Sequence, residues 1–322
     1  MTFPFWDQRR RDQFRRNRTP RDLRAHCAGA RPLRFQPLAM VLSISLALSC
    51  ALAIPAKTSA AARPARAQEE SAQQLVRDVV WNEVQAQTHD TTHWRFHETQ
   101  WKRAGRKLYD VIETKYGALH RLLAIDGKPL EGTALQAENS HIQQLSTDPD
   151  EIRAAQKRRD ADARQERKML EMLPNAFIFR RVGQDGNVVK LAFTPDPTFH
   201  PATREDQVFH HMEGTLLVDG QMKRLLQIDG RLTSPVQFWG GLLGHLDAGG
   251  TFKVVQRNVG DGHWDMVYLH VNMSGKALFF KTISVHQQES YSNFQRVPDD
   301  LTPEQAAREL KADLDSRAFA GE

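Results

Sequence analysis

Cysteine is nearly absent from this sequence of 322 residues, in which only Cys27 and Cys50 occur. Neither lies in residues 68–322, so that region can contain no disulfide, no thiol nucleophile and no cysteine-based metal site. A folded domain there has to be held together by its apolar core.

Familiar catalytic motifs are also lacking. The sequence contains no G-x-S-x-G elbow, no Walker-type phosphate loop and no dinucleotide fingerprint. His93 and His97 would share one face of a strand about 13 Å apart, which exceeds the reach of a single tetrahedral ion. We therefore expect no enzymatic activity, no cofactor and no metal. The alternative is a hydrolase, which would require His93, His97 or His263 to meet carboxylates inside a pocket.

One long apolar run is present, from Leu38 to Ile54, between Arg34 and a small-residue stretch that ends at Ala67. The run is short for a membrane span, and its flanks are typical of a secretory signal peptide. We expect residues 1–67 to be an Arg-rich extension and signal peptide, and residues 68–322 to form one periplasmic or secreted domain.

Three alternatives concern the leader. Translation could begin at Met40, or the arginine pairs upstream could form a twin-arginine signal. The segment from Leu46 to Cys50 loosely resembles a lipobox, and a lipidated Cys50 would anchor the protein to a membrane.

Without the leader, the charge of the chain changes sign. Residues 1–67 hold 13 of the 44 basic residues and three of the 39 acidic ones, which leaves 31 basic and 36 acidic residues, a formal charge of −5. The mature chain is mildly acidic, so we expect no nucleic-acid partner.

The period of the apolar residues predicts an α+β domain that is mainly β. Three- and four-residue spacings predict a helix over residues 70–86, and a period of two follows in three strands between His93 and Ile125. Polar, helical sequence occupies about 130–173, with Asp148 as a cap and charges of both signs along a solvated face. The remaining chain is predicted to be an antiparallel meander, closed by a helix over 303–314 with Thr302 as its cap.

Several strands of the meander are apolar on both faces. Alternation would place Trp264, Met266 and Tyr268 on one face and Val267 and Leu269 on the other. Ser274-Gly275 is predicted to be the next turn, with the last strand spanning 276–286. Such strands need apolar cover on both sides, either in a plain packed sandwich or around a cavity that holds a ligand.

We selected the large apolar residues that could line a cavity or its mouth. The segment from Phe238 to Gly244 alternates large apolar residues with glycines, which fits a lip at a cavity mouth or a tight buried corner. The candidate ligand-binding residues are Trp94, Phe96, Phe238, Trp239, Trp264, Met266 and Tyr268.

The order of these elements resembles the lipoprotein-carrier superfamily, the LolA/LolB-like outer-membrane lipoprotein-sorting proteins. The resemblance covers most of residues 70–290, with MEGTLLVDGQMKRLLQIDGRL (212–232) and GGTFKVVQ (249–256) within the meander. It implies a curved antiparallel sheet that forms an incomplete barrel covered by helices, with a concave face that accepts acyl chains. The arginine with which the family's carrier contacts acyl chains has no counterpart that can be placed in this sequence.

From the residues and the resemblance together, we expect a non-enzymatic carrier or binding protein for lipid or lipoprotein acyl chains. Inner- or outer-membrane components would be its further partners. The alternative is an envelope sensor or scaffold that binds a partner protein through exposed strand edges and the charged helices of residues 133–173.

Overall fold

The computed structural model describes residues 71–203, 205–238, 244–277 and 281–319. The chain divides into two units, Met1–Gln8 with Glu70–Glu322, and Arg9–Glu69. All described residues belong to the first unit. The predicted leader, residues 1–67, lies outside the described residues and stays a prediction.

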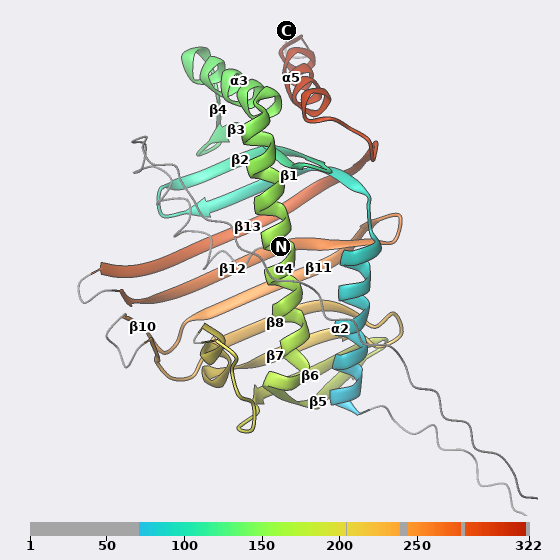
Figure 1. The fold of residues 1–322 in the computed structure, drawn as a ribbon, viewed down its shortest axis with the longest axis vertical. Coiled ribbons are helices and arrows are strands. Elements are labelled where there is room, and N and C mark those ends of the chain that lie inside the picture. Colours follow the sequence, from blue (N-terminus) through green and yellow to red (C-terminus); the bar gives the residue numbers. More distant parts are fainter. Residues whose placement is uncertain (1–70, 204, 239–243, 278–280, 320–322) are drawn as a thin grey trace, which may run out of the picture. The chain divides into compact units, whose positions relative to one another are not determined.

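Four α-helices and a short 3-10 helix lie within the described part of the chain (Figure 1). They are α2 (Ala72–His89), α3 (Gly132–Thr147), α4 (Pro149–Ala176), α5 (Pro303–Phe319) and η1 (Glu205–His211).

Thirteen strands are found in the same described ranges, and all their pairings are antiparallel. They are β1 (His93–Lys102), β2 (Gly105–Thr114), β3 (Gly117–Ile125), β4 (Lys128–Pro129), β5 (Phe177–Asp185), β6 (Val188–Pro195), β7 (Met212–Asp219), β8 (Arg224–Leu232), β9 (Val236–Phe238), β10 (Gly244–Leu246), β11 (Thr251–Gly260), β12 (His263–Ala277) and β13 (Lys281–Val297).

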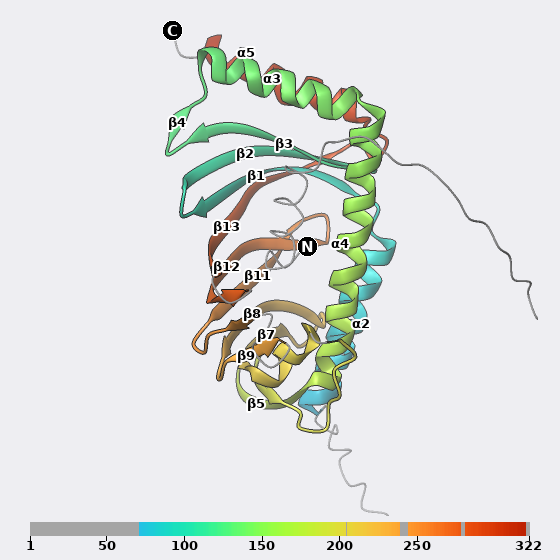
Figure 2. The same ribbon diagram turned by 60° about the vertical axis from the view of Figure 1, so that its left-hand side comes forward.

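The strands form a single sheet in the order β4-β3-β2-β1-β13-β12-β11-β8-β7-β6-β5, with β10 beside β12 and β9 beside β10. The pairing of β1 with β13 joins the first and last strands of the chain, so that the two meanders become one surface. Because β4 and β5 are the ends of this order, the sheet is not closed. Figure 2 shows it as a strongly curved surface. The fold is therefore α+β and mainly β, an incomplete barrel covered by helices, as the sequence predicts.

Local sequence explains where the helices begin. Ser71 caps α2 by accepting a hydrogen bond from the Gln74 backbone N–H, and Asp148 caps α4 by accepting one from Asp150. At α5, Thr302 and Gln305 each accept a hydrogen bond from the other's backbone N–H, which is a capping box. The predictions of Asp148 and Thr302 as caps are both confirmed.

One predicted turn is wrong. Ser274 and Gly275 do not end a strand, because they pair with Ser284 and Ile283 and β12 continues to Ala277. The Cβ of any other residue at position 275 would lie 2.1 Å from the His245 carbonyl oxygen. This glycine therefore allows β10 to approach β12 closely, and it is not there to make a turn.

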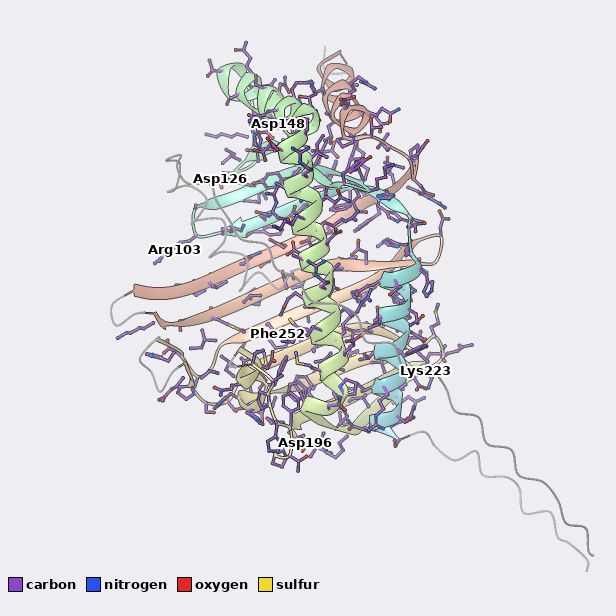
Figure 3. The ribbon with its side chains drawn as sticks, viewed as in Figure 1. Arg103, Asp126, Asp148, Asp196, Lys223 and Phe252 are labelled. Atoms are coloured by element: carbon purple, nitrogen blue, oxygen red, sulfur yellow. The ribbon has the colours of Figure 1, made fainter. Side chains whose placement is uncertain are left out.

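The main core lies on the concave face of the sheet. Side chains from β5 to β8 and from β11 to β13 pack there against α2, which contributes Leu75, Val76, Val79 and Val80. The long helix α4 crosses the strands on the same side, as Figures 1 and 2 show. In Figure 3 Phe252, a member of this core, lies to the left of α4, whereas Lys223 lies to the right of α2.

A second core lies on the opposite face of β2 and β3. Ile112 and Leu119 pack there against Ile142 of α3 and Leu310 of α5. Val111, the neighbour of Ile112 on β2, belongs to a separate cluster on the concave face. The sheet thus has helices on both faces, at different ends of its strand order.

Candidate functional site

Four of the predicted ligand-binding residues lie on the concave face. Trp94 and Phe96 occupy alternate positions of β1, and Phe96 pairs with Val111 of β2. Met266 of β12 packs in the main core. Trp264 lies two residues away on the same side, next to α2.

An aromatic cluster surrounds Phe96. Its ring lies 5.9 Å from the ring of Tyr291 in an edge-on arrangement and 5.2 Å from that of Phe294 in a stacked one. Both geometries are favourable for aromatic pairs. Tyr291 and Phe294 come from the part of β13 beyond residue 286, where the sequence predicts that the last strand has ended. The sequence analysis therefore missed them.

Trp264 is positioned through α2. The Arg224 guanidinium lies 5.5 Å from the Trp264 ring and donates two hydrogen bonds to Glu83 of α2, at 3.1 and 3.0 Å. A cation over an indole face is attracted by the electrons of the ring. The side of Trp264 that faces α2 therefore lies next to charged groups, whereas Met266 packs among the apolar residues of the main core.

Tyr268 lies on the other face of the sheet, contrary to the prediction. The pairing of β11 with β12 shifts by one residue between Val255 and Gln256, opposite Met266 and Tyr268. This bulge places Met266 and Leu269 in the same core, so Tyr268 points to the convex face. Of the two remaining candidates, Phe238 ends β9 and Trp239 lies outside the described residues.

Next to the aromatic residues, the concave face of β1 and β13 carries buried polar side chains. Glu98 follows Phe96 on the concave face, where its carboxylate lies 3.0 Å from His120 Nδ1 and accepts a hydrogen bond from Gln100. On β13 Glu289 accepts from the Tyr291 hydroxyl at 2.6 Å and from Gln287. Extending the two-residue alternation beyond Phe96 would have placed Glu98 in this surface.

The two buried carboxyl groups differ in their proton affinity. Burial alone would raise the pKa of Glu98, but the hydrogen bonds and charge of His120, together with Gln100, hold it below its usual value. Burial raises the pKa of Glu289, and the nearby charge of Glu98 adds to this effect. Burial and the same carboxylates raise the pKa of Tyr291. Glu98 therefore releases its proton at a lower pH than Glu289 does.

His263 meets two carboxylates, which is one of the two conditions of the hydrolase alternative; the other is that they lie inside a pocket. Its Nδ1 lies 2.5 Å from Asp90 and its Nε2 lies 3.8 Å from Asp265, and its ring stacks on Trp94 at 4.9 Å between centroids. Burial would lower the pKa of His263, but the bonds to Asp265 and Asp90 raise it. Within the described residues, no serine or threonine hydroxyl is hydrogen-bonded to His263.

His93 and His97 do not join this group. Nδ1 of His93 has no hydrogen-bond partner within the described ranges, and Nδ1 of His97 lies 3.0 Å from Asn293 Nδ2. Among residues whose positions are described, no three His, Cys, Asp or Glu side chains are grouped to bind a metal ion.

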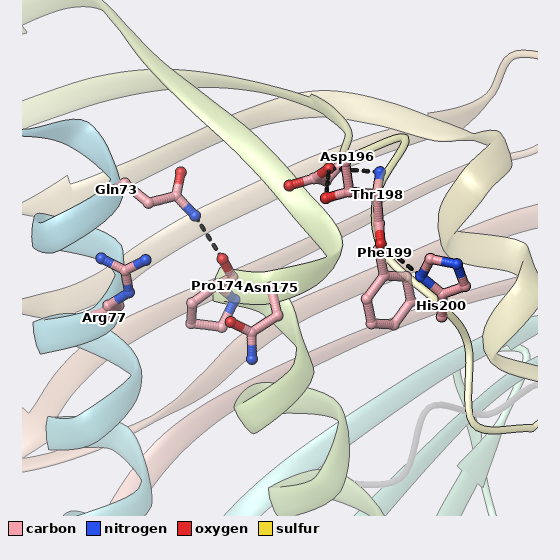
Figure 4. Close-up of a pocket in the computed structure, with 8 residues that line it drawn as sticks. All are labelled: Gln73, Arg77, Pro174, Asn175, Asp196, Thr198, Phe199 and His200. Carbon is pink, nitrogen blue, oxygen red and sulfur yellow. Dashed lines mark hydrogen bonds between the residues drawn. The ribbon is translucent and has the colours of Figure 1, made fainter.

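A polar pocket of about 450 Å³ lies away from the aromatic residues, near the start of β5 (Figure 4). Its lining comes from α2, from the end of α4 and from the segment after β6, and comprises Gln73, Arg77, Pro174, Asn175, Asp196, Thr198, Phe199 and His200. Asp196 accepts two hydrogen bonds from Thr198, and His200 Nδ1 lies 2.7 Å from the Thr198 carbonyl oxygen. The pocket is mostly polar, so it is not a site for acyl chains.

No protein-family model and no curated protein matches this chain. None of the helices in the described ranges is both long and apolar enough to cross a membrane.

Proposed function

We propose that the protein is an exported, non-enzymatic carrier or binding protein that holds lipid or lipoprotein acyl chains on the concave face of its sheet. One observation carries the proposal. The sheet is strongly curved but not closed, and apolar side chains continue over its concave face from the main core to the separate cluster of Trp94, Phe96 and Val111.

The physical argument concerns which groups shield the apolar concave face from water. A small closed barrel fills its interior with its own side chains, whereas a wider, open one leaves an apolar surface that something else must cover. Helices α2 and α4 lie over the concave face, and Trp94, Phe96 and Val111 are 3%, 8% and 0% exposed. An acyl chain therefore has to enter between the sheet and this cover. An acyl chain beside Phe96 would gain about 0.8 kcal/mol for each CH₂ group removed from water. The resemblance to lipoprotein carriers and the expected signal peptide support the same proposal, with membrane components as partners.

The first experiment asks what the protein carries. Protein purified without detergent is examined by native mass spectrometry, which should detect bound lipid or acylated protein that organic solvent removes. Delipidated protein should then bind fatty acids with an affinity that rises about fourfold for each added CH₂ group. Affinity that does not depend on chain length would contradict the proposal.

The second experiment locates the site with a matched pair of aromatic substitutions. Phe96→Ala removes a ring from the concave face and should weaken fatty-acid binding about tenfold. Tyr268→Ala removes a ring from the convex face and should leave the affinity unchanged. Displacement of a fluorescent fatty acid measures both variants. Equal losses in the two variants would place the site elsewhere.

A further inference from the structure

Strand β5 is one edge of the sheet. β6 pairs along one side of it, and no strand in the described part of the chain pairs along the other. Edge strands expose backbone N–H and C=O groups with which another extended chain can pair. This edge therefore offers a surface for a partner to bind as an added strand.

At the beginning of β5, a side chain makes the backbone hydrogen bonds that a paired strand would make. Gln73 of α2 donates a hydrogen bond from Nε2 to the Phe177 carbonyl oxygen at 3.1 Å and accepts one at Oε1 from the Phe179 N–H at 3.2 Å. The carboxamide thus stands where a peptide unit of a neighbouring strand would be. The outer side of β5 accepts an amide at this point, and a partner strand would lie beside the residues that follow.

Two large apolar side chains and a cation are exposed along β5, which has a bulge at Val182, between Arg181 and Gly183. Ile178 and Val182 are 49% and 41% exposed, among the few large apolar residues on the described surface. Arg180 lies between them and is also exposed. An added strand would bring its own side chains opposite these residues.

Several cations elsewhere on the convex face have a counter-charge. Arg95, Arg231 and Lys253 each form an ion pair, with Asp110, Glu213 and Asp229 respectively. Arg180, which pairs with Ala192 of β6, and Lys190 of β6, which pairs with Gly183, form no ion pair with any described residue. The edge thus combines exposed apolar groups with two cations that lack a counter-charge.

We propose that the outer edge of β5 binds an extended segment of a partner protein in which apolar, acidic and apolar side chains alternate on one face. The acidic side chain would lie opposite Arg180, with Lys190 one strand further away on β6 beside Gly183, and the apolar side chains would lie near Ile178 and Val182. A second copy of this chain fits less well. Two-fold antiparallel pairing centred on Arg180 would set two guanidinium groups opposite each other, which is destabilising.

The test uses two labelled seven-residue peptides and the full chain. One peptide has valine, glutamate and valine at its second, fourth and sixth positions and threonine elsewhere, and the other has lysine in place of glutamate. Fluorescence anisotropy at low ionic strength should show the glutamate peptide binding about fivefold more tightly. The double variant Arg180→Glu with Lys190→Glu should prefer the lysine peptide. The control Arg231→Glu reverses a charge on β8 and should not alter the preference.

Two results would overturn the proposal. One is that a folded protein binds neither peptide, or binds both equally before and after the charge reversal. The other is a dimer in sedimentation velocity that the double variant abolishes, because a second copy would then occupy the edge. The outcome is independent of fatty-acid binding, so failure of either proposal leaves the other standing.

Discussion

At the scale of single residues, the main core contains a charged pair. Glu83 of α2 is 5% exposed, accepts two hydrogen bonds from Arg224, and accepts a third from the Leu225 N–H at 2.9 Å. Burial raises the pKa of Glu83, although Arg224 acts in the opposite direction. The pair fixes α2 across the turn between β7 and β8, and the same guanidinium lies against Trp264.

We predict that Glu83→Gln lowers the free energy of unfolding by about 3 kcal/mol, because it leaves the Arg224 charge buried without a counter-charge. Urea denaturation measures the change. The control Arg231→Ala breaks the pair with Glu213, in which Arg231 is mostly exposed, and should cost under about 1 kcal/mol. Equal costs would mean that the Glu83 pair is no better sheltered from water than the surface pair.

A second residue-scale prediction concerns pH. Burial, aided by the charge of Asp265, raises the pKa of Glu113 to about 7, from an ordinary value of 4.5. As the pH rises from 4.5 toward 7, the unfolded chain releases this proton before the folded protein does, so Glu113 lowers stability over that range. Below pH 4.5 the side chain is protonated in both states and has no such effect.

Glu113→Gln imitates the protonated form and can still accept the hydrogen bond from the Trp94 N–H. We predict that the variant matches the parent protein in stability at pH 4, becomes more stable than it as the pH rises, and keeps a constant advantage above pH 7. Denaturation at a series of pH values tests this. Glu304→Gln, on the exposed surface of α5, serves as the control. An advantage that is the same at every pH would contradict the prediction.

At the scale of elements, most of the fold could be predicted from sequence because local signals determine it. The period changes from near four to two after α2, and turns such as Asp126-Gly127 use residues that tolerate positive φ, here 51° and 80°. Caps and periodicity depend only on residues close together in sequence. They therefore located the helices, the insertion and most strands.

Where the sheet contains bulges, the two-residue period predicted the wrong face of the sheet for some residues. One bulge moves Tyr268 to the convex face, and another, where the pairing of β7 with β8 shifts between Leu217 and Val218, puts both Leu225 and Ile228 in the core, although they are three residues apart. A bulge depends on how two strands pair, and neither strand's own sequence marks it. For the same reason the candidate site was predicted only in part. Trp94 and Phe96 keep their alternation because the register shift between Arg95 and His97 adds its extra residue to β13. Tyr291 and Phe294 lie on β13 at that shift, in a stretch that gains its strand structure by pairing with β1.

At the scale of the whole described unit, the two faces of the sheet have separate cores. The concave core connects α2 to β5–β8, and the convex core connects α3 and α5 to β2 and β3. Arg121 crosses the second core, where it is 1% exposed and donates hydrogen bonds to the Leu310 carbonyl oxygen and to Asn139. A change in the convex core should therefore alter stability without altering the concave surface.

Leu310→Ala tests this separation. The side chain is 1% exposed, and its removal should lower the free energy of unfolding by about 3 kcal/mol through lost burial and the cavity it leaves. The backbone carbonyl that receives Arg121 remains. Under conditions in which the variant is fully folded, its affinity for a fatty acid should stay within about twofold of the parent value, because additivity holds for distant sites without shared partners. A loss as large as that of Phe96→Ala would show that α5 and the acyl-binding surface are coupled through the sheet.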